Sequence, residues 1–270
     1  MTSISGQKRI MLWAVPRSLS GAMCRVMLNS GLTTKVMYEP YAECYHLGPE
    51  RVSTHDMKFQ PDPSRSYSNI KTKQELPYEG KELVFVKNQA YHLAPDRLTA
   101  EWIPDGFTHT FIIRNPRSTI ISKLKLLKKC TGWNYDPRES GYQEQVQIAH
   151  VLQQLGHRLV VIDADDLMEN PEGILRAYCR EVGLEFKPSM IHWEPLSEPD
   201  FQETFLCGVW EPSWFDNVRT ASGLYPKPKM AAKDTGNDVS YDAETRDLIG
   251  RSERENTKYY EELYALRLTA

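Results

Sequence analysis

The sequence predicts an α/β fold in which a parallel β-sheet is flanked by helices. Five short, continuously apolar runs lie between residues 9 and 162, and helical periodicity fills several of the gaps between them. Strands that are buried on both faces are apolar along their whole length, and their alternation with helices is typical of a parallel sheet covered on two sides. A chain of 270 residues can bury such a core once, so we expect a single domain over residues 1–270.

The first strand is expected at Arg9–Val15, where the chain becomes continuously apolar. Ser20–Ser30 follows as a helix, because its apolar side chains recur about one turn apart. A second strand is expected at Lys35–Tyr38 and ends at a Glu-Pro pair. Residues 50–80 are polar and rich in Pro and Ser, so we expect an excursion with little regular structure that covers the substrate site.

Three further strands are expected at Leu83–Val86, Thr108–Ile113 and Leu159–Ile162. The helices between them are expected at Pro116–Lys129, which starts with proline at the first helical position, and at Tyr142–Leu155. This order repeats the strand–helix alternation of the first part of the chain. It supports one sheet rather than two separate ones.

The last third of the chain carries weaker signals. Asp163–Pro171 follows the fifth strand and leads into a well-capped amphipathic helix, so we count this acidic segment toward the fold and not toward a site. A final helix with mixed charges is expected at Ala243–Arg267, but the sequence does not identify what it packs against.

Composition excludes several classes of partner. The net charge is −3 and 26% of the residues are charged, so no global attraction to nucleic acid or to an anionic membrane is expected. Five cysteines without close pairing favour reduced thiols, and neither a signal peptide nor a membrane-spanning run is recognisable. We therefore expect a cytoplasmic protein. The sequence leaves its oligomeric state open.

Two segments, each following an expected strand and opening a helix, carry a cation and small hydroxyl side chains. The first consists of Pro16, Arg17, Ser18, Leu19, Ser20 and Gly21, and the second runs from Arg114 to Ser122. Helix N-termini offer unpaired N–H groups and a positive dipole end, so each segment can hold an anion. Both lie at the carboxyl ends of strands, where ligands of parallel sheets bind. Together they predict a ligand with two separated anionic ends, although each segment alone also fits an ordinary capped helix beside a solvated or salt-bridged arginine.

This pair of segments resembles the 5′- and 3′-phosphate motifs of sulfotransferases that use 3′-phosphoadenosine 5′-phosphosulfate (PAPS). In that family the first motif is usually Pro-Lys-Ser-Gly-Thr-Thr or a Pro-Arg-Ser relative. Here Leu19 stands at the usual glycine and Gly21 at the second hydroxyl residue. Arg114 and Ser122 have the spacing of the second motif, and Asn115-Pro116 also matches. In style the first motif is similar to bacterial and marine-invertebrate small-molecule sulfotransferase-like proteins.

The resemblance implies a P-loop NTPase-like sulfotransferase fold. It also implies transfer of the sulfuryl group from PAPS to a hydroxyl or nitrogen of a small-molecule acceptor, such as a specialised metabolite, with 3′-phosphoadenosine 5′-phosphate (PAP) as product and no metal. Arg17 would neutralise the oxygens around the breaking bond, while Arg114 and Ser122 would bind the 3′-phosphate. Two other functions stay open: a catalytically inactive nucleotide-binding protein of this fold, and a small-molecule kinase, for which the chain lacks a Walker A sequence.

The acceptor side of the site departs furthest from the family. Cytosolic sulfotransferases carry a catalytic His after the third strand, preceded closely by a Lys that contacts the sulfate. Lys87 matches that Lys, but Gln89 stands at the His position and His92 is the nearest histidine. We therefore expect His92 or, alternatively, Glu39 at the end of the second strand to act as the base; His92 also fits a capping histidine, and Lys87 a solvated strand end. Ser222 is a further candidate for nucleotide contact.

Overall fold

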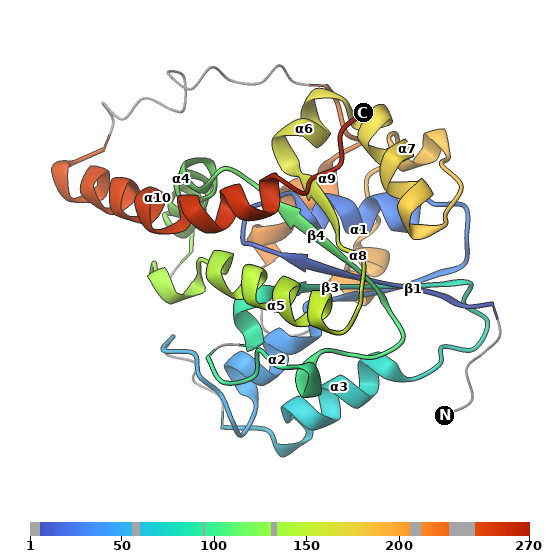
Figure 1. Cartoon of the computed structure of the whole chain (residues 1–270), viewed down its shortest axis with the longest axis horizontal. Helices are drawn as coiled ribbons and strands as arrows, with labels where there is room; N and C mark the ends of the chain where they lie inside the picture. Colours follow the sequence, from blue (N-terminus) through green and yellow to red (C-terminus); the bar gives the residue numbers. More distant parts are fainter. Residues whose placement is uncertain (1–5, 56–59, 94, 131–133, 206–211, 227–240) are drawn as a thin grey trace.

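The sheet of this protein contains five parallel strands in the order β2-β3-β1-β4-β5 (Figure 1). The strands are β1 (Lys8–Ala14), β2 (Thr34–Tyr38), β3 (Leu83–Gln89), β4 (Thr108–Ile113) and β5 (Val160–Asp163). The computed structural model describes residues 6–55, 60–93, 95–130, 134–205, 212–226 and 241–270. Within these residues the predicted α/β fold with a parallel sheet flanked by helices is confirmed.

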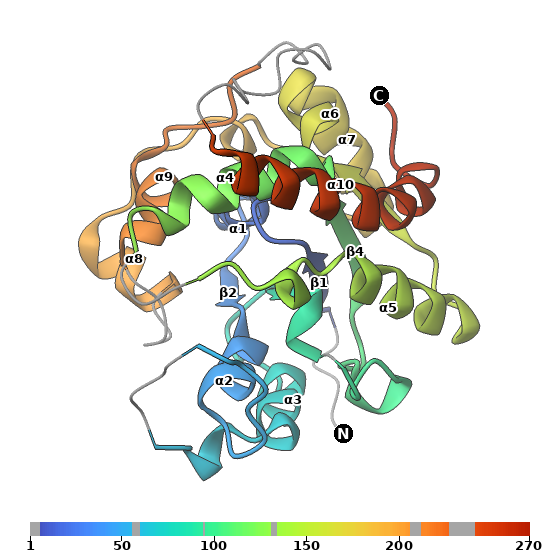
Figure 2. The same cartoon turned by 90° about the vertical axis from the view of Figure 1, so that its left-hand side faces the viewer.

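Helices cover both faces of the sheet. Their bounds are α1 (Ser20–Leu28), α2 (Pro40–Leu47), α3 (Tyr67–Glu75), α4 (Pro116–Leu127), α5 (Tyr142–Gln154), α6 (Ala164–Glu169), α7 (Pro171–Val182), α8 (Glu198–Phe205), α9 (Asp216–Thr220) and α10 (Ala243–Tyr264). Figure 2 separates two layers, with α2 and α3 on one side of the sheet and α1, α6 and α7 on the other.

The central strand β1 explains why the core has two halves. Its side chains alternate between faces, so Ile10 and Leu12 join the apolar cluster that contains α1, α7 and α8. Met11 and Trp13 join the cluster on the opposite face, with α2, α3 and α5. Both faces of β1 are therefore buried, as its continuous apolar sequence predicts.

Strand β3 extends past its expected end at Val86 and finishes at Gln89. The added residues are polar but buried, because neighbouring elements supply hydrogen-bond partners. Asn88, for example, donates to the Gln74 side chain at 2.8 Å and accepts from the Tyr41 backbone N–H at 3.1 Å. An apolar pattern cannot show a strand end of this kind.

The expectation of little regular structure at residues 50–80 is wrong for its second half. A short 3₁₀ turn at Pro63–Arg65 leads into α3, whose first N–H groups are capped by the Ser66 hydroxyl. Tyr67 and Ile70 lie about one turn apart and are buried in the core, which stabilises the helix despite its polar composition.

The C-terminal helix α10 packs against α4 and α5, which the sequence could not identify (Figure 1). Beyond it, the backbone N–H of Leu268 donates to the carbonyl of Val161 at 2.8 Å, so the chain end lies beside β5. Among the residues described, no helix is both long and apolar enough to cross a membrane.

Candidate functional site

A cavity of about 470 Å³ lies where β1, β2, β3 and β4 end. Its wall contains many of the residues that the sequence singled out: Pro16, Arg17, Leu19, Ser20, Gly21, Glu39, Arg114 and Ser122. Ser18, Lys87, His92 and Ser222 are not part of this wall. Segments more than a hundred residues apart in sequence therefore meet at one edge of the sheet, as predicted for a parallel fold.

The loop between β1 and α1 has an unusual backbone. Arg17 and Leu19 adopt left-handed conformations, with φ of 66° and 64°. Leu19 thus takes the backbone conformation that the family's glycine adopts freely, at a cost on the order of 1–2 kcal/mol. Alternation of right- and left-handed residues turns successive N–H groups toward one point and forms an anion-binding concavity. The Ser18 hydroxyl donates back to the Val15 carbonyl at 2.7 Å, which fixes the turn from inside the protein.

Gly21 occupies a position where a side chain would not fit. A Cβ atom there would lie 2.7 Å from Cγ2 of Val218, on α9. The glycine allows the segment around α9 to pack directly against α1 and to form part of the cavity wall. This packing accounts for glycine where the family motif usually has a hydroxyl residue.

The two predicted phosphate segments are joined by direct hydrogen bonds. Nε of Arg17 donates to the Ser122 hydroxyl at 3.1 Å, and Nη1 of Arg114 donates to the Arg17 carbonyl at 3.0 Å. Nε of Arg114 also donates to Oδ1 of Asp165, in the first turn of α6, at 3.2 Å. The cations of the two segments therefore lie in one network at the cavity wall.

Glu39 lines the same cavity and belongs to a buried charged cluster. It has φ of 51°, which turns the chain sharply between β2 and α2. Lys87 and Gln89 both donate to Oε1 of Glu39, the latter at 3.0 Å. Lys87 is fully buried, and burial lowers its pKa while the Glu39 carboxylate opposes that shift. The sequence left Lys87 as a solvated strand end or as a contact to the sulfate. In the structure this side chain is buried and holds Glu39.

His92 lies behind the cavity wall. It is fully buried in a 3₁₀ turn and packs against Tyr45, Tyr91 and His46, with ring centroids 4.4–5.9 Å away. Burial, followed by the charges of neighbouring groups, lowers its pKa well below the usual value. Because the 3₁₀ turn after β3 directs this ring into the protein, His92 does not reach the cavity as the sequence prediction required.

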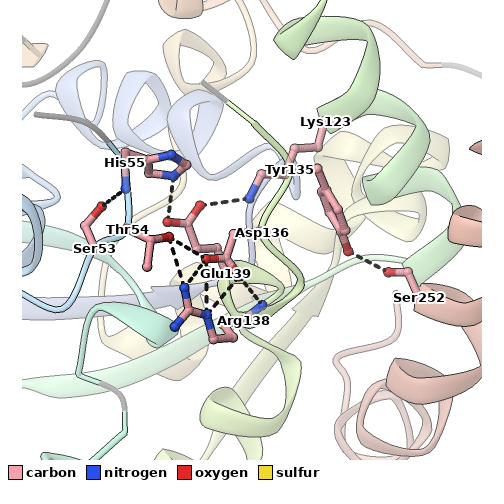
Figure 3. Close-up of polar contacts among 9 residues, drawn as sticks. All are labelled: Ser53, Thr54, His55, Lys123, Tyr135, Asp136, Arg138, Glu139 and Ser252. Atoms are coloured by element: carbon pink, nitrogen blue, oxygen red, sulfur yellow. Dashed lines mark hydrogen bonds and ion pairs between the residues drawn. The ribbon is translucent and has the colours of Figure 1, made fainter. Parts of the chain in front are cut away.

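A second carboxylate, which sequence reasoning missed, lines the same cavity (Figure 3). Glu139 is 3% exposed; Nε2 of His55 lies 2.9 Å from its Oε1, and Lys123 donates to its Oε2 at 3.2 Å. Burial alone would raise the pKa of Glu139, but the His55 contact and Lys123 outweigh burial and lower it. Lys123, on α4, also lines the cavity.

The sequence led us to expect that residues 50–80 cover the substrate site. None of the described residues in this range lines the cavity. The segment contacts the site indirectly through His55, and next to it Thr54 donates to Asp136 at 3.0 Å (Figure 3). The aromatic side chains of Trp214 and Phe215, just before α9, line the cavity.

A family model described as a sulfotransferase domain matches residues 8–239. The chain belongs to the sulfotransferase family. Two solved sulfotransferases share its fold: one from Alicyclobacillus acidocaldarius (TM-score 0.51, 11% identity, 95% of each chain covered) and mouse SULT7A1 complexed with PAP (TM-score 0.52, 11% identity, 92% of this chain and 84% of that one). At these identities the likeness concerns the fold alone.

Two curated relatives from Arabidopsis thaliana are named branched-chain-amino-acid aminotransferase-like proteins 1 and 2. The first is 28% identical over 80% of this sulfotransferase chain, and the second is 30% identical over 49% of it. The matched regions make up only 36% and 22% of those proteins. The chain therefore spans about a third or less of the length of these relatives.

The remaining predicted residue of this sulfotransferase, Ser222, lies just outside the cavity. Its hydroxyl is 2.8 Å from the Tyr225 hydroxyl, whereas its neighbours Ala221 and Gly223 line the wall. No group of three or more His, Cys, Asp or Glu side chains suited to a metal ion occurs among the described residues.

Proposed function

We propose that this protein transfers the sulfuryl group of PAPS to a hydroxyl or nitrogen of a small-molecule acceptor and releases PAP. The observation that carries the proposal is the hydrogen-bonded network that joins Arg17, Ser122 and Arg114 at one cavity. This network brings two guanidinium groups to one cavity, where both can bind anionic groups of a nucleotide donor. That mouse SULT7A1 was solved with PAP on the same fold supports this donor.

In the proposed reaction the acceptor's oxygen or nitrogen forms a bond to sulfur while the bond between sulfur and the bridging oxygen of PAPS breaks. The electron pair leaves with PAP, and the acceptor's proton goes to a protein base. Catalysis of this kind depends mainly on alignment and on cations near the oxygens that gain charge. In this proposal Arg17 and the N–H groups of the β1–α1 loop supply that charge, and Arg114 with Ser122 holds the 3′-phosphate.

For the base we propose Glu39 rather than His92. Glu39 lines the cavity and is only 4% exposed, whereas His92 is enclosed behind the wall. Lys87 and Gln89 both donate to the same carboxylate oxygen, Oε1. The sequence left both residues open, and cavity geometry favours the carboxylate.

Calorimetry tests the donor assignment. Arg114→Ala should weaken PAP binding by about 10-fold to 100-fold, since a charged hydrogen bond contributes roughly 1.5–3 kcal/mol, and should barely change binding of an analogue without the 3′-phosphate. Arg117→Ala is the matched control, because Arg117 lies three residues further along, in the first turn of α4, but pairs with Glu253. Equal losses for both nucleotides would contradict the assignment. PAP binding without transfer to any acceptor would favour the inactive nucleotide-binding protein.

A further inference from the structure

The guanidinium of Arg114 is held at two points. Its Nη1 donates to the Arg17 carbonyl at 3.0 Å, and its Nε donates to Asp165 at 3.2 Å. Arginine carries five N–H groups in a rigid plane, so two contacts from different directions fix both the position and the tilt of that plane. The N–H groups left over belong to the two terminal nitrogens, which form the fork that suits a phosphate.

Asp165 is itself fixed by the fold. Its backbone N–H donates to the Asp163 carboxylate at 2.9 Å, which caps α6. Burial raises the pKa of Asp163 to about 6, and Tyr260 donates to its second oxygen at 3.0 Å. Asp165 therefore projects from a helix start that is anchored to both β5 and α10.

The three acidic residues after β5 have different partners. Asp163 caps α6, and Asp166 pairs with Arg267 near the chain end at 2.7 Å. Asp165 forms an ion pair with Arg114, a residue of the cavity wall. The pair is partly exposed, with 25% of the Arg114 side chain and 35% of the Asp165 side chain accessible. Exposed ion pairs contribute little to folding stability, so the main effect of this pair is to orient Arg114.

We infer that Asp165 is a positioning residue of the donor site: it orients Arg114 so that one guanidinium binds the 3′-phosphate and also holds the Arg17 carbonyl of the β1–α1 loop. This inference rests on the proposed function. Its consequence is that a guanidinium without its Asp165 contact can rotate away from the 3′-phosphate.

A double-mutant cycle with PAP and its analogue without the 3′-phosphate tests the inference. Asp165→Asn should weaken PAP binding by about 3-fold to 10-fold and leave the analogue nearly unchanged. The same substitution in the Arg114→Ala background should have no further effect, and Asp165→Glu should restore part of the affinity. Asp166→Asn is the matched control, because it removes the neighbouring carboxylate that pairs with Arg267.

The outcomes separate this inference from the proposed function. If Asp165→Asn bound PAP as tightly as the unaltered protein, or more tightly, the inference would be overturned. That result is expected if the only effect of the Asp165 carboxylate is to repel phosphate. A loss that persists in the Arg114→Ala background would also overturn it and would assign Asp165 a purely structural role at α6. If the unaltered protein binds no PAP, the proposed function and the inference both fail; if only Arg114→Ala acts, the function stands and the inference falls.

Discussion

The two ends of the cavity are built in different ways. What we propose as the donor end comes from two short continuous segments, Pro16–Gly21 and Arg114–Ser122, each at the junction of a strand and a helix. What we propose as the acceptor end is assembled from residues on separate elements, with Glu39 held by Lys87 and Glu139 held by His55 and Lys123. The donor end uses loop backbone and arginine, whereas the acceptor end uses buried carboxylates with opposite charges behind them.

This difference shows which part of a binding site a sequence motif can encode. A helix N-terminus forms locally, so its anion-binding groups are adjacent in sequence. A buried ion pair needs two partners from different strands, since only the assembled core brings them together. Replacing residues at the acceptor end should therefore change chemistry and stability, and the donor end should control nucleotide affinity.

The largest expected effect is at the acceptor end. Glu39→Gln should lower the single-turnover rate of sulfuryl transfer by about 100-fold or more, since a general base contributes roughly 10²–10⁴. PAP affinity should stay near that of the unaltered protein. Glu43→Gln, in the first turn of the helix that Glu39 precedes and outside the cavity wall, is the control. Loss of transfer in His92→Ala with an active Glu39→Gln would return the base to the histidine, and full activity of both would indicate alignment alone.

A smaller effect is expected on folding stability, from the buried Glu39–Lys87 pair. Lys87→Met should lower the free energy of unfolding by about 3 kcal/mol, because removing one partner leaves a buried carboxylate uncompensated. Adding Glu39→Leu should recover much of that loss, as measured by denaturant unfolding. Arg251→Met removes an exposed pair with Asp247 and should cost at most about 0.5 kcal/mol. If Lys87→Met and Arg251→Met lowered the free energy of unfolding by the same amount, the Glu39–Lys87 pair would not be buried in solution.

The smallest expected effect concerns metal. Because Arg17, Arg114 and the loop N–H groups are proposed to neutralise the donor, turnover should be unchanged by EDTA. An assay of PAP release with and without chelator checks this. Abolition by EDTA and rescue by magnesium would break the description of the donor end and favour the kinase alternative.

Much of the fold could be predicted because its signals are local. Apolar runs placed all five strands, and the caps and proline at the start of α4 placed that helix. The end of β3 and the helix α3 could not be predicted in this way, since Lys87, Asn88 and Ile70 are stabilised by partners distant in sequence. Polar composition favoured a loop there, and tertiary packing overrode it.

For the site, the sequence by itself determined that cations and hydroxyl residues lie at two strand–helix junctions, because this follows from residue type and spacing. Only the tertiary structure decided that Leu19 adopts a left-handed conformation, that His92 turns into the core, and that Glu139 and Asp165 reach the cavity or its arginine. The physical reason is how far apart in the sequence the interacting residues lie. Helix ends and turns depend on neighbours along the chain, whereas the orientation and ionisation of a buried side chain depend on whatever the fold packs against it.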